Sequence, residues 1–292
     1  MWALTLYTKD WLDERVMELG EWPSEAYGEF RDRMLDLEIQ FPCILGQKGF
    51  RANQLRFAFL SDFRSCKSRE ELAQALAEYG QQARTCGQYT SFVAFFDTPC
   101  SLRSSYGVED FEQVFWSLLQ DIHELDEQSW PVDVPQDVDQ TLWEFCFGGE
   151  HYFVLCATPA HHRRKSREFP YFYVAFQPRF VFEKIHDQTV FGRKMKERIR
   201  ERLIEYDEAA IHPALRWYGE PDNREWKQYF LPDDERVATH CPFHAGAMNK
   251  SLVTEFTTRP SELGRLDENG QSCNAPKQQE ADEKSRPCRG VQ

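Results

Sequence analysis

Apolar residues recur along this chain at two spacings, one typical of helices and one typical of strands. Spacings of three and four residues predict amphipathic helices over 23–40, 68–79, 108–124 and 194–210. Short runs of β-branched and aromatic residues predict strands over 55–60, 91–96, 142–147, 151–156 and 171–176. The chain therefore mixes helices and strands from its beginning to about residue 210.

Local signals predict where three of these elements begin or end. Proline disfavours helical geometry in the residue before it, so we expect Pro42 to end the first helix. Ser68 and Glu71 have the spacing of a capping box, which predicts the start of the second helix. Gly148-Gly149 predicts a tight turn between two strands. The apolar face of the first helix consists of Tyr27, Phe30, Met34 and Leu37.

Strands joined by short turns, with helices grouped around them, predict an α+β fold with an antiparallel or mixed central sheet covered by helices. We expect one globular domain over residues 1–256, a length that supports a real core. Residues 257–292 are polar and almost devoid of large apolar side chains. Such a segment buries too little surface to offset its ordering entropy, so we expect a disordered tail.

Composition narrows the classes of partner and compartment. The 48 acidic and 35 basic residues among 292 give a formal net charge of −13, which argues against nucleic acid or an anionic membrane as partner. No apolar run is long enough for a membrane span, and the first residues lack a secretory pattern. Nine cysteines without a CxxC pair argue against a disulfide framework, so we expect reduced thiols in a cytoplasmic protein.

Three segments together resemble the YqcI/YcgG family over residues 25–245. These segments are Phe41 to Gln47, Thr158 to Phe169 with Gln177 to Phe182, and His212 to Phe243. That family is similar to the haem-dependent N-hydroxylases of the guanitoxin pathway. The resemblance implies an oxidoreductase that uses haem to hydroxylate a nitrogen of an amino-acid-like or guanidine-bearing small molecule.

One position departs from the related sequences. They carry a histidine-proline pair before the arginine-rich segment, whereas this chain has Thr158-Pro159 and places its histidines at His161 and His162. If the histidine of that pair ligates iron in the relatives, the ligand here is lost or lies elsewhere. The departure favours an alternative function, in which a non-catalytic protein binds a small anion or haem.

Basic residues cluster between two of the predicted strands. Arg164, Arg167 and Arg179 are candidates for cofactor binding, because a guanidinium binds a carboxylate or phosphate with two parallel hydrogen bonds. Haem propionates or a substrate carboxylate would suit them. This role requires that they converge on an interior cavity. The alternative is a set of solvated loop charges.

Three residues are candidate iron ligands. His162 lies beside the arginines, and His212 precedes a proline after a helix, where a fixed corner could aim it inward. Cys43 would supply a thiolate, which favours oxygen–oxygen cleavage. The alternatives are ordinary loop histidines and a buried apolar thiol. Gln228 and Tyr229 are candidates for substrate binding, and the alternative is a packing role.

Overall fold

The computed structural model describes residues 6–183, 189–216 and 220–244, and the expected tail over 257–292 lies outside them. Within these residues the α-helices are α1 (Lys9–Arg15), α2 (Glu21–Leu35), α3 (Ile44–Arg51), α4 (Cys66–Cys86), α5 (Cys100–Ser105), α6 (Val108–Glu124) and α7 (Val190–Asp207). The 3-10 helices are η1 (Val16–Leu19), η2 (Arg179–Val181) and η3 (Glu225–Gln228). The strands are β1 (Tyr7–Thr8), β2 (Arg56–Leu60), β3 (Phe92–Phe96), β4 (Phe145–Phe147), β5 (Glu150–Ala157) and β6 (Tyr173–Pro178).

The six strands form one mixed sheet in the order β1-β2-β3-β6-β5-β4. β2 and β3 are parallel, with Ala58 opposite Ala94, and all other neighbours are antiparallel. A parallel pair needs a crossover, which α4 provides between these two strands. The predicted α+β class with a mixed, helix-covered sheet is thus confirmed.

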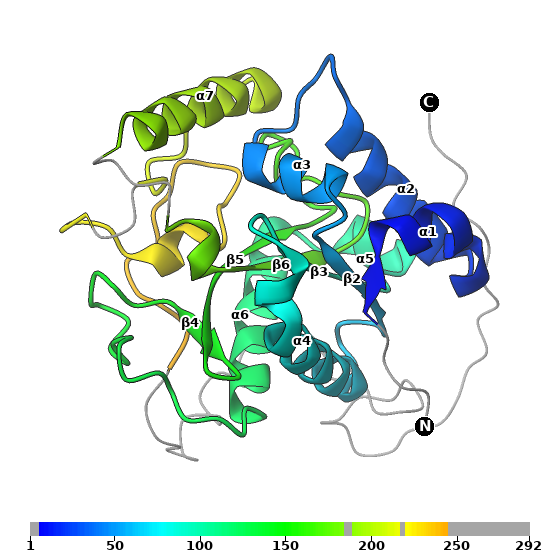
Figure 1. The fold of residues 1–292 in the computed structure, drawn as a ribbon, viewed down its shortest axis with the longest axis horizontal. Helices are drawn as coiled ribbons and strands as arrows, with labels where there is room; N and C mark the ends of the chain where they lie inside the picture. The colour runs from blue at the N-terminus through cyan, green and yellow to red at the C-terminus, as the bar shows by residue number, and fades with distance from the viewer. Residues whose placement is uncertain (1–5, 184–188, 217–219, 245–292) are drawn as a thin grey trace.

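Helices cover both faces of the sheet (Figure 1). Successive strand side chains point to opposite faces, so each strand contributes to two cores. On one face Ala94 and Phe96 of β3 belong to the core that α4 and α6 complete. On the other face Val93 and Phe95 pack into the core formed with α2 and α3. This double burial explains why β3 is apolar at every position.

Strand direction gives the sheet two chemically different ends. β5 runs in the same direction as β2 and β3, because each of β3 and β5 is antiparallel to β6. These three strands therefore finish at one end of the sheet, here called the β5 end. The opposite end, where β6 finishes at Pro178, is called the β6 end.

Several local predictions are confirmed. α6 has the predicted bounds of 108–124. Gly148 and Gly149 have φ values of 62° and 76°, which a two-residue hairpin turn of this hand requires and which glycine adopts without strain. The turn joins β4 to β5 in the expected hairpin.

Two local predictions are wrong. α2 ends at Leu35, because the carboxylate of Asp36 accepts hydrogen bonds from the backbone N–H groups of residues 38 and 39, and Leu37 is left exposed. The capping box is also absent. Ser65 caps α4, Ser68 donates to the Ser65 carbonyl at 2.7 Å, and Glu71 accepts hydrogen bonds from residue 61 instead.

The cysteines differ in state. Free thiols are present at Cys43, Cys86, Cys146, Cys156 and Cys241. Cys66 and Cys100 are disulfide-bonded, so the expectation of reduced thiols is wrong at these two positions. None of the helices in the described part of the chain has the length and apolar character that a membrane crossing requires.

Candidate functional site

The loop that follows β5 is folded back onto the sheet at the β5 end. The backbone N–H of Thr158 donates to the carbonyl of Arg167 at 2.9 Å, and the N–H of Phe169 donates to the carbonyl of Thr158 at 3.0 Å. The carboxylate of Asp233 accepts hydrogen bonds from three successive backbone N–H groups, those of residues 162 to 164. The loop over 158–169 is therefore fixed at both of its ends and across its middle.

Arg164 holds this loop to two other segments. Its side chain is buried, and each of its three nitrogens donates to a backbone carbonyl: Nε to Pro232 at 2.8 Å, and the terminal nitrogens to Ala210 and Asp234 at 3.3 and 3.2 Å. Burial lowers the pKa of the guanidinium. These contacts indicate a structural role for Arg164, which was predicted to bind a cofactor.

Arg167 is also buried, but its hydrogen bonds are few and long. Its terminal nitrogens donate to the carbonyls of Cys156 and Gln228 at 3.4 and 3.3 Å. No carboxylate of the described residues forms an ion pair with it. Asp207 is near enough to affect its pKa, but that carboxylate accepts hydrogen bonds from the N–H and hydroxyl of Ser166. Desolvation lowers the pKa of Arg167, as expected for a buried charge without a counter-ion.

A thiol and a phenol lie within the electrostatic field of Arg167. Burial raises the pKa of Tyr173, while the charge of Arg167 opposes this shift. Burial also raises the pKa of Cys43, and the N–H groups of Gly46 and Leu45 together with Arg167 act in the opposite direction. The sulfur of Cys43 accepts a hydrogen bond from Gly46 at 3.2 Å, at the start of α3.

The histidines of the predicted site divide into three cases. His162 is exposed, whereas its neighbour His161 is buried and bonded through both ring nitrogens, to the Thr158 hydroxyl and the Leu231 carbonyl. Burial lowers the pKa of His161 to about 4. His212 is buried as well, and burial lowers its pKa to about 4.

The tautomer of His212 follows from its contacts. Its Nδ1 accepts a hydrogen bond from the N–H of Ala214 at 3.1 Å, so the neutral ring carries its proton on Nε2. Nε2 has no hydrogen-bond partner among the described residues. The backbone of Arg236 raises the pKa of the ring but does not reach hydrogen-bonding geometry. A protonated Nε2 is a donor and is not ready to ligate a metal.

Arg179 lies at the β6 end, away from the other two arginines. Its Nε donates to the carboxylate of Glu144 at 2.8 Å, a second nitrogen also contacts Glu144, and that nitrogen lies 3.5 Å from Glu225. Both carboxylates are buried, and Glu144 also contacts Nδ1 of His151 at 3.0 Å. Burial raises the pKa of Glu225, against which Arg179 acts. Arg179 is thus the counter-ion of two buried acids.

Gln228 and Tyr229 make mainly structural contacts. The side-chain amide of Gln228 donates to Asn223 and Glu225, and its backbone carbonyl accepts from Arg167. Tyr229 donates from its hydroxyl to the Tyr152 carbonyl at 2.9 Å, and the same oxygen accepts from the N–H of Phe145 at 3.1 Å. Tyr229 therefore completes backbone hydrogen bonding beside β4 and β5, and substrate binding by either residue stays a prediction.

Cys43 and Tyr173 thus lie near enough to Arg167, at the β5 end, for its charge to act on their pKa values. Sequence reasoning missed Tyr173, since strand periodicity places it in a core but does not place it beside an arginine. It also missed Glu144 and Glu225, because single acidic residues between aromatic ones give no signal of pairing. The pairing is visible only in the structure, where both acids are buried beside Arg179.

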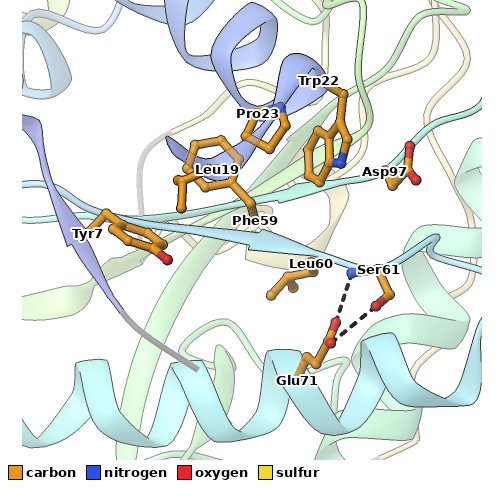
Figure 2. A pocket seen from close by; sticks show the side chains of 9 residues that line it. All are labelled: Tyr7, Leu19, Trp22, Pro23, Phe59, Leu60, Ser61, Glu71 and Asp97. Carbon is orange, nitrogen blue, oxygen red and sulfur yellow. Dashed lines mark hydrogen bonds between the residues drawn. The ribbon is translucent and has the colours of Figure 1, made fainter. Parts of the chain in front are cut away.

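Two hollows in the described part of the chain are lined by residues other than the predicted site residues. One lies where β2 and β3 finish, beside α2 (Figure 2). The other lies between α4 and α6. Arg164 and Arg167 point inward and Arg163 is exposed, and a cavity shared by the arginines stays a prediction.

A haem would need a ligand with an available lone pair and a cation for its propionates. No group of three or more His, Cys, Asp or Glu side chains in residues 6–183, 189–216 and 220–244 is arranged to hold a metal ion by itself. Haem iron needs fewer protein ligands. Among the three predicted ligands, Cys43 has the donor set that fits, since its sulfur accepts backbone N–H groups and lies in the field of Arg167.

Comparisons with known proteins agree with the resemblance seen in the sequence. The profile of the YqcI/YcgG family matches residues 30–244. The Bacillus subtilis (strain 168) proteins YcgG and YqcI are 50% and 48% identical over 238 residues, which cover 82% of this chain and 94% of each relative. A Streptomyces lavendulae protein named "Putative N(omega)-hydroxy-L-arginine synthase DcsA" is 29% identical over 233 residues, 77% of this chain and 85% of its own. No solved structure matches.

Proposed function

Because the chain belongs to the YqcI/YcgG family, we propose that it is an oxidoreductase that hydroxylates a nitrogen of a guanidine-bearing, amino-acid-like small molecule, with haem as cofactor. The name of the Streptomyces relative supports this reaction class. The reaction inserts one atom of O2 into an N–H bond. The other atom leaves as water, with two protons and two electrons from an external donor. The cytoplasmic location stays a prediction.

The observation that carries the proposal is the buried Arg167 without a carboxylate partner among the described residues. A buried charge is costly unless it is paired. The carboxylate of an amino-acid substrate, or a haem propionate, would supply the missing negative charge through two parallel hydrogen bonds. The hydroxyl of Tyr173, which makes no hydrogen bond with the described residues, would donate a further one.

Cys43 is the residue that would hold the cofactor. Burial raises the pKa of its thiol, so it stays protonated until a metal displaces the proton. The N–H of Gly46 is already directed at the sulfur and would stabilise the thiolate. When bound, the haem supplies the activation of O2 that hydroxylation requires. The surrounding side chains exclude water, which strengthens the hold of Arg167 on an anion.

Haem binding is tested by purifying the full chain from cells fed 5-aminolevulinate and recording its absorption spectrum. We expect a Soret band that Cys43→Ala abolishes or shifts, with Cys86→Ala as the matched control on another partly buried thiol. The product test is incubation with L-arginine, a reductant and O2, followed by mass spectrometry for a gain of one oxygen. A colourless protein that also fails to take up hemin would refute the hypothesis of a haem-dependent reaction.

The alternative function is binding without catalysis. The resemblance implies a histidine where this chain has Thr158, and the Thr158 hydroxyl is bonded to His161 at 2.8 Å. An anion-binding protein would be stabilised by small carboxylates, with a loss of this effect in Arg167→Met. Such a shift without product in the haem-loaded protein would favour this function. If neither stabilisation by carboxylates nor a hydroxylated product is observed, Arg167 serves neither anion binding nor hydroxylation.

A further inference from the structure

The hollow at the β5 end beside α2 has a volume of about 330 Å³. It lies where the parallel strands β2 and β3 finish, which is where open sheets commonly bind ligands. Figure 2 shows its walls converging from β1, η1, α2, the two strand ends and α4. The lining residues are Tyr7, Leu19, Trp22, Pro23, Phe59, Leu60, Ser61, Glu71 and Asp97.

Aromatic rings form one side of this hollow. The rings of Trp22 and Phe59 are 5.7 Å apart with edge-to-face geometry, and those of Tyr7 and Phe59 are 6.0 Å apart. All three side chains are only partly buried, so some of their surface remains available. The faces of such rings carry negative partial charge and attract cations.

Two carboxylates, those of Glu71 and Asp97, also line the hollow, and they differ in their partners. Glu71 accepts hydrogen bonds from the N–H and hydroxyl of Ser61 at 2.8 and 3.1 Å, and lies 3.3 Å from Lys67. No described residue donates a hydrogen bond to the carboxylate of Asp97, although that residue is partly buried. Burial raises the pKa of Asp97, and the charge of Asp62 adds to this effect.

The nearby cations are occupied elsewhere. Arg64 forms an ion pair with Asp62 at 2.7 Å. Arg103 weakly favours the charged form of Asp97, but its Nε donates to the Thr98 carbonyl and its guanidinium lies 3.9 Å from the ring centre of Tyr171. The hollow therefore presents a carboxylate without a counter-ion among the described residues.

We propose that this hollow binds a small organic cation with a guanidinium or alkylammonium head, whose charge pairs with Asp97 and whose flat or apolar surface lies against Trp22 and Phe59. The volume falls in the range of about 300–1,000 Å³ that is typical of small-molecule sites. A bare metal ion would suit it less, because metal ions prefer several oxygen ligands to aromatic rings. The site needs neither haem nor Arg167, so it stands apart from the proposed hydroxylation.

The test compares methylguanidinium with its neutral isostere methylurea, each titrated into the full chain and followed by ligand-observed NMR. We expect saturable binding of methylguanidinium and no binding of methylurea. Asp97→Asn should weaken the binding about tenfold or more, since a hydrogen bond to a charged group contributes that much. Equal binding of both probes, or no loss in Asp97→Asn, would overturn the proposal.

Matched variants separate this site from others. Glu112→Gln is the control for Asp97→Asn, because Glu112 is another partly buried carboxylate whose pKa burial raises, on α6. It should leave methylguanidinium binding unchanged. Trp22→Leu should weaken binding severalfold and Trp22→Phe less, whereas Arg167→Met should have no effect. Loss of binding in Arg167→Met equal to that in Asp97→Asn would show that the hollow is not the site.

Discussion

Two arginines at opposite ends of the same sheet, Arg167 buried and Arg179 partly buried, differ in what surrounds them. Arg179 at the β6 end faces the buried carboxylates of Glu144 and Glu225. Arg167 at the β5 end meets only two carbonyl groups, at 3.4 and 3.3 Å, and no carboxylate of the described residues. Both charges are at least partly removed from water, but among the described residues only Arg179 has carboxylate counter-ions.

This difference distinguishes an arginine that stabilises the fold from an arginine that is available to bind a ligand. Removal of an arginine that neutralises buried acids strongly lowers the stability of the protein, because the acids stay buried without a counter-ion. An arginine that is desolvated and poorly bonded lowers stability in the free protein. Such a residue is best explained by a ligand that completes it.

The largest effect is expected at the β6 end. Arg179→Met leaves Glu144 and Glu225 buried without their cation, which should lower the free energy of unfolding by about 3–5 kcal/mol. Arg167→Met removes weak hydrogen bonds together with a desolvated charge, so it should change stability by less than about 1 kcal/mol. Urea denaturation measures both.

Arg163→Met serves as the control for both substitutions, since Arg163 is exposed and should change stability by no more than about 0.5 kcal/mol. If Arg167→Met destabilises the protein as much as Arg179→Met, the two arginines do not differ in their contribution to stability. In that case Arg167 would also be part of the scaffold, and no ligand would be needed to explain its burial.

A smaller effect concerns the polar groups of the loop over 158–169. His161 is neutral in the folded protein, because burial lowers its pKa to about 4 from an ordinary value of 6.5. The unfolded chain takes up a proton as the pH falls below 6.5, so folding stability is lost between pH 6.5 and 4. The shift corresponds to about 3 kcal/mol over this window.

His161→Asn should remove most of this contribution to the pH dependence, while His162→Asn, at the exposed neighbour, should leave it intact. The measurement is the free energy of unfolding at several pH values between 4 and 7. An unchanged slope in His161→Asn would mean that the bonds to Thr158 and Leu231 do not fix the neutral ring. A reduced slope would confirm that the buried, neutral ring of His161 carries this part of the pH dependence.

Much of the fold was predictable because its signals are local. The periodicity of 108–124 predicts α6 with its observed bounds, and the glycine pair predicts the turn between β4 and β5. The errors occurred where one polar side chain decides the outcome. Asp36 ends α2 early, and Ser65 rather than Ser68 caps α4. Each choice depends on a side-chain contact that apolar spacing does not encode.

The site was less predictable, because it depends on which buried groups find partners. Arg164, Arg167 and Arg179 look alike in the sequence, but their partners differ. Arg164 binds three carbonyls, Arg167 has only two long hydrogen bonds, and Arg179 neutralises two acids. The partners come from the far-apart segments around residues 144, 210 and 225–234. Long-range contacts of this kind leave no periodic trace in a single chain.

The smallest effect tests whether Arg167 faces Cys43. The charge of Arg167 lowers the pKa of this thiol against the larger effect of burial, so Arg167→Met should reduce the fraction of thiolate at a given pH. Alkylation of Cys43 by iodoacetamide should slow by about fivefold, the ratio for a screened interaction of about 1 kcal/mol.

Peptide mass spectrometry follows each cysteine separately. Cys86 is the internal reference, because its pKa responds to burial and to Arg56 rather than to Arg167. Equal slowing at both thiols would mean a general change in the fold, and an unchanged rate at Cys43 would mean that Arg167 does not face this thiol.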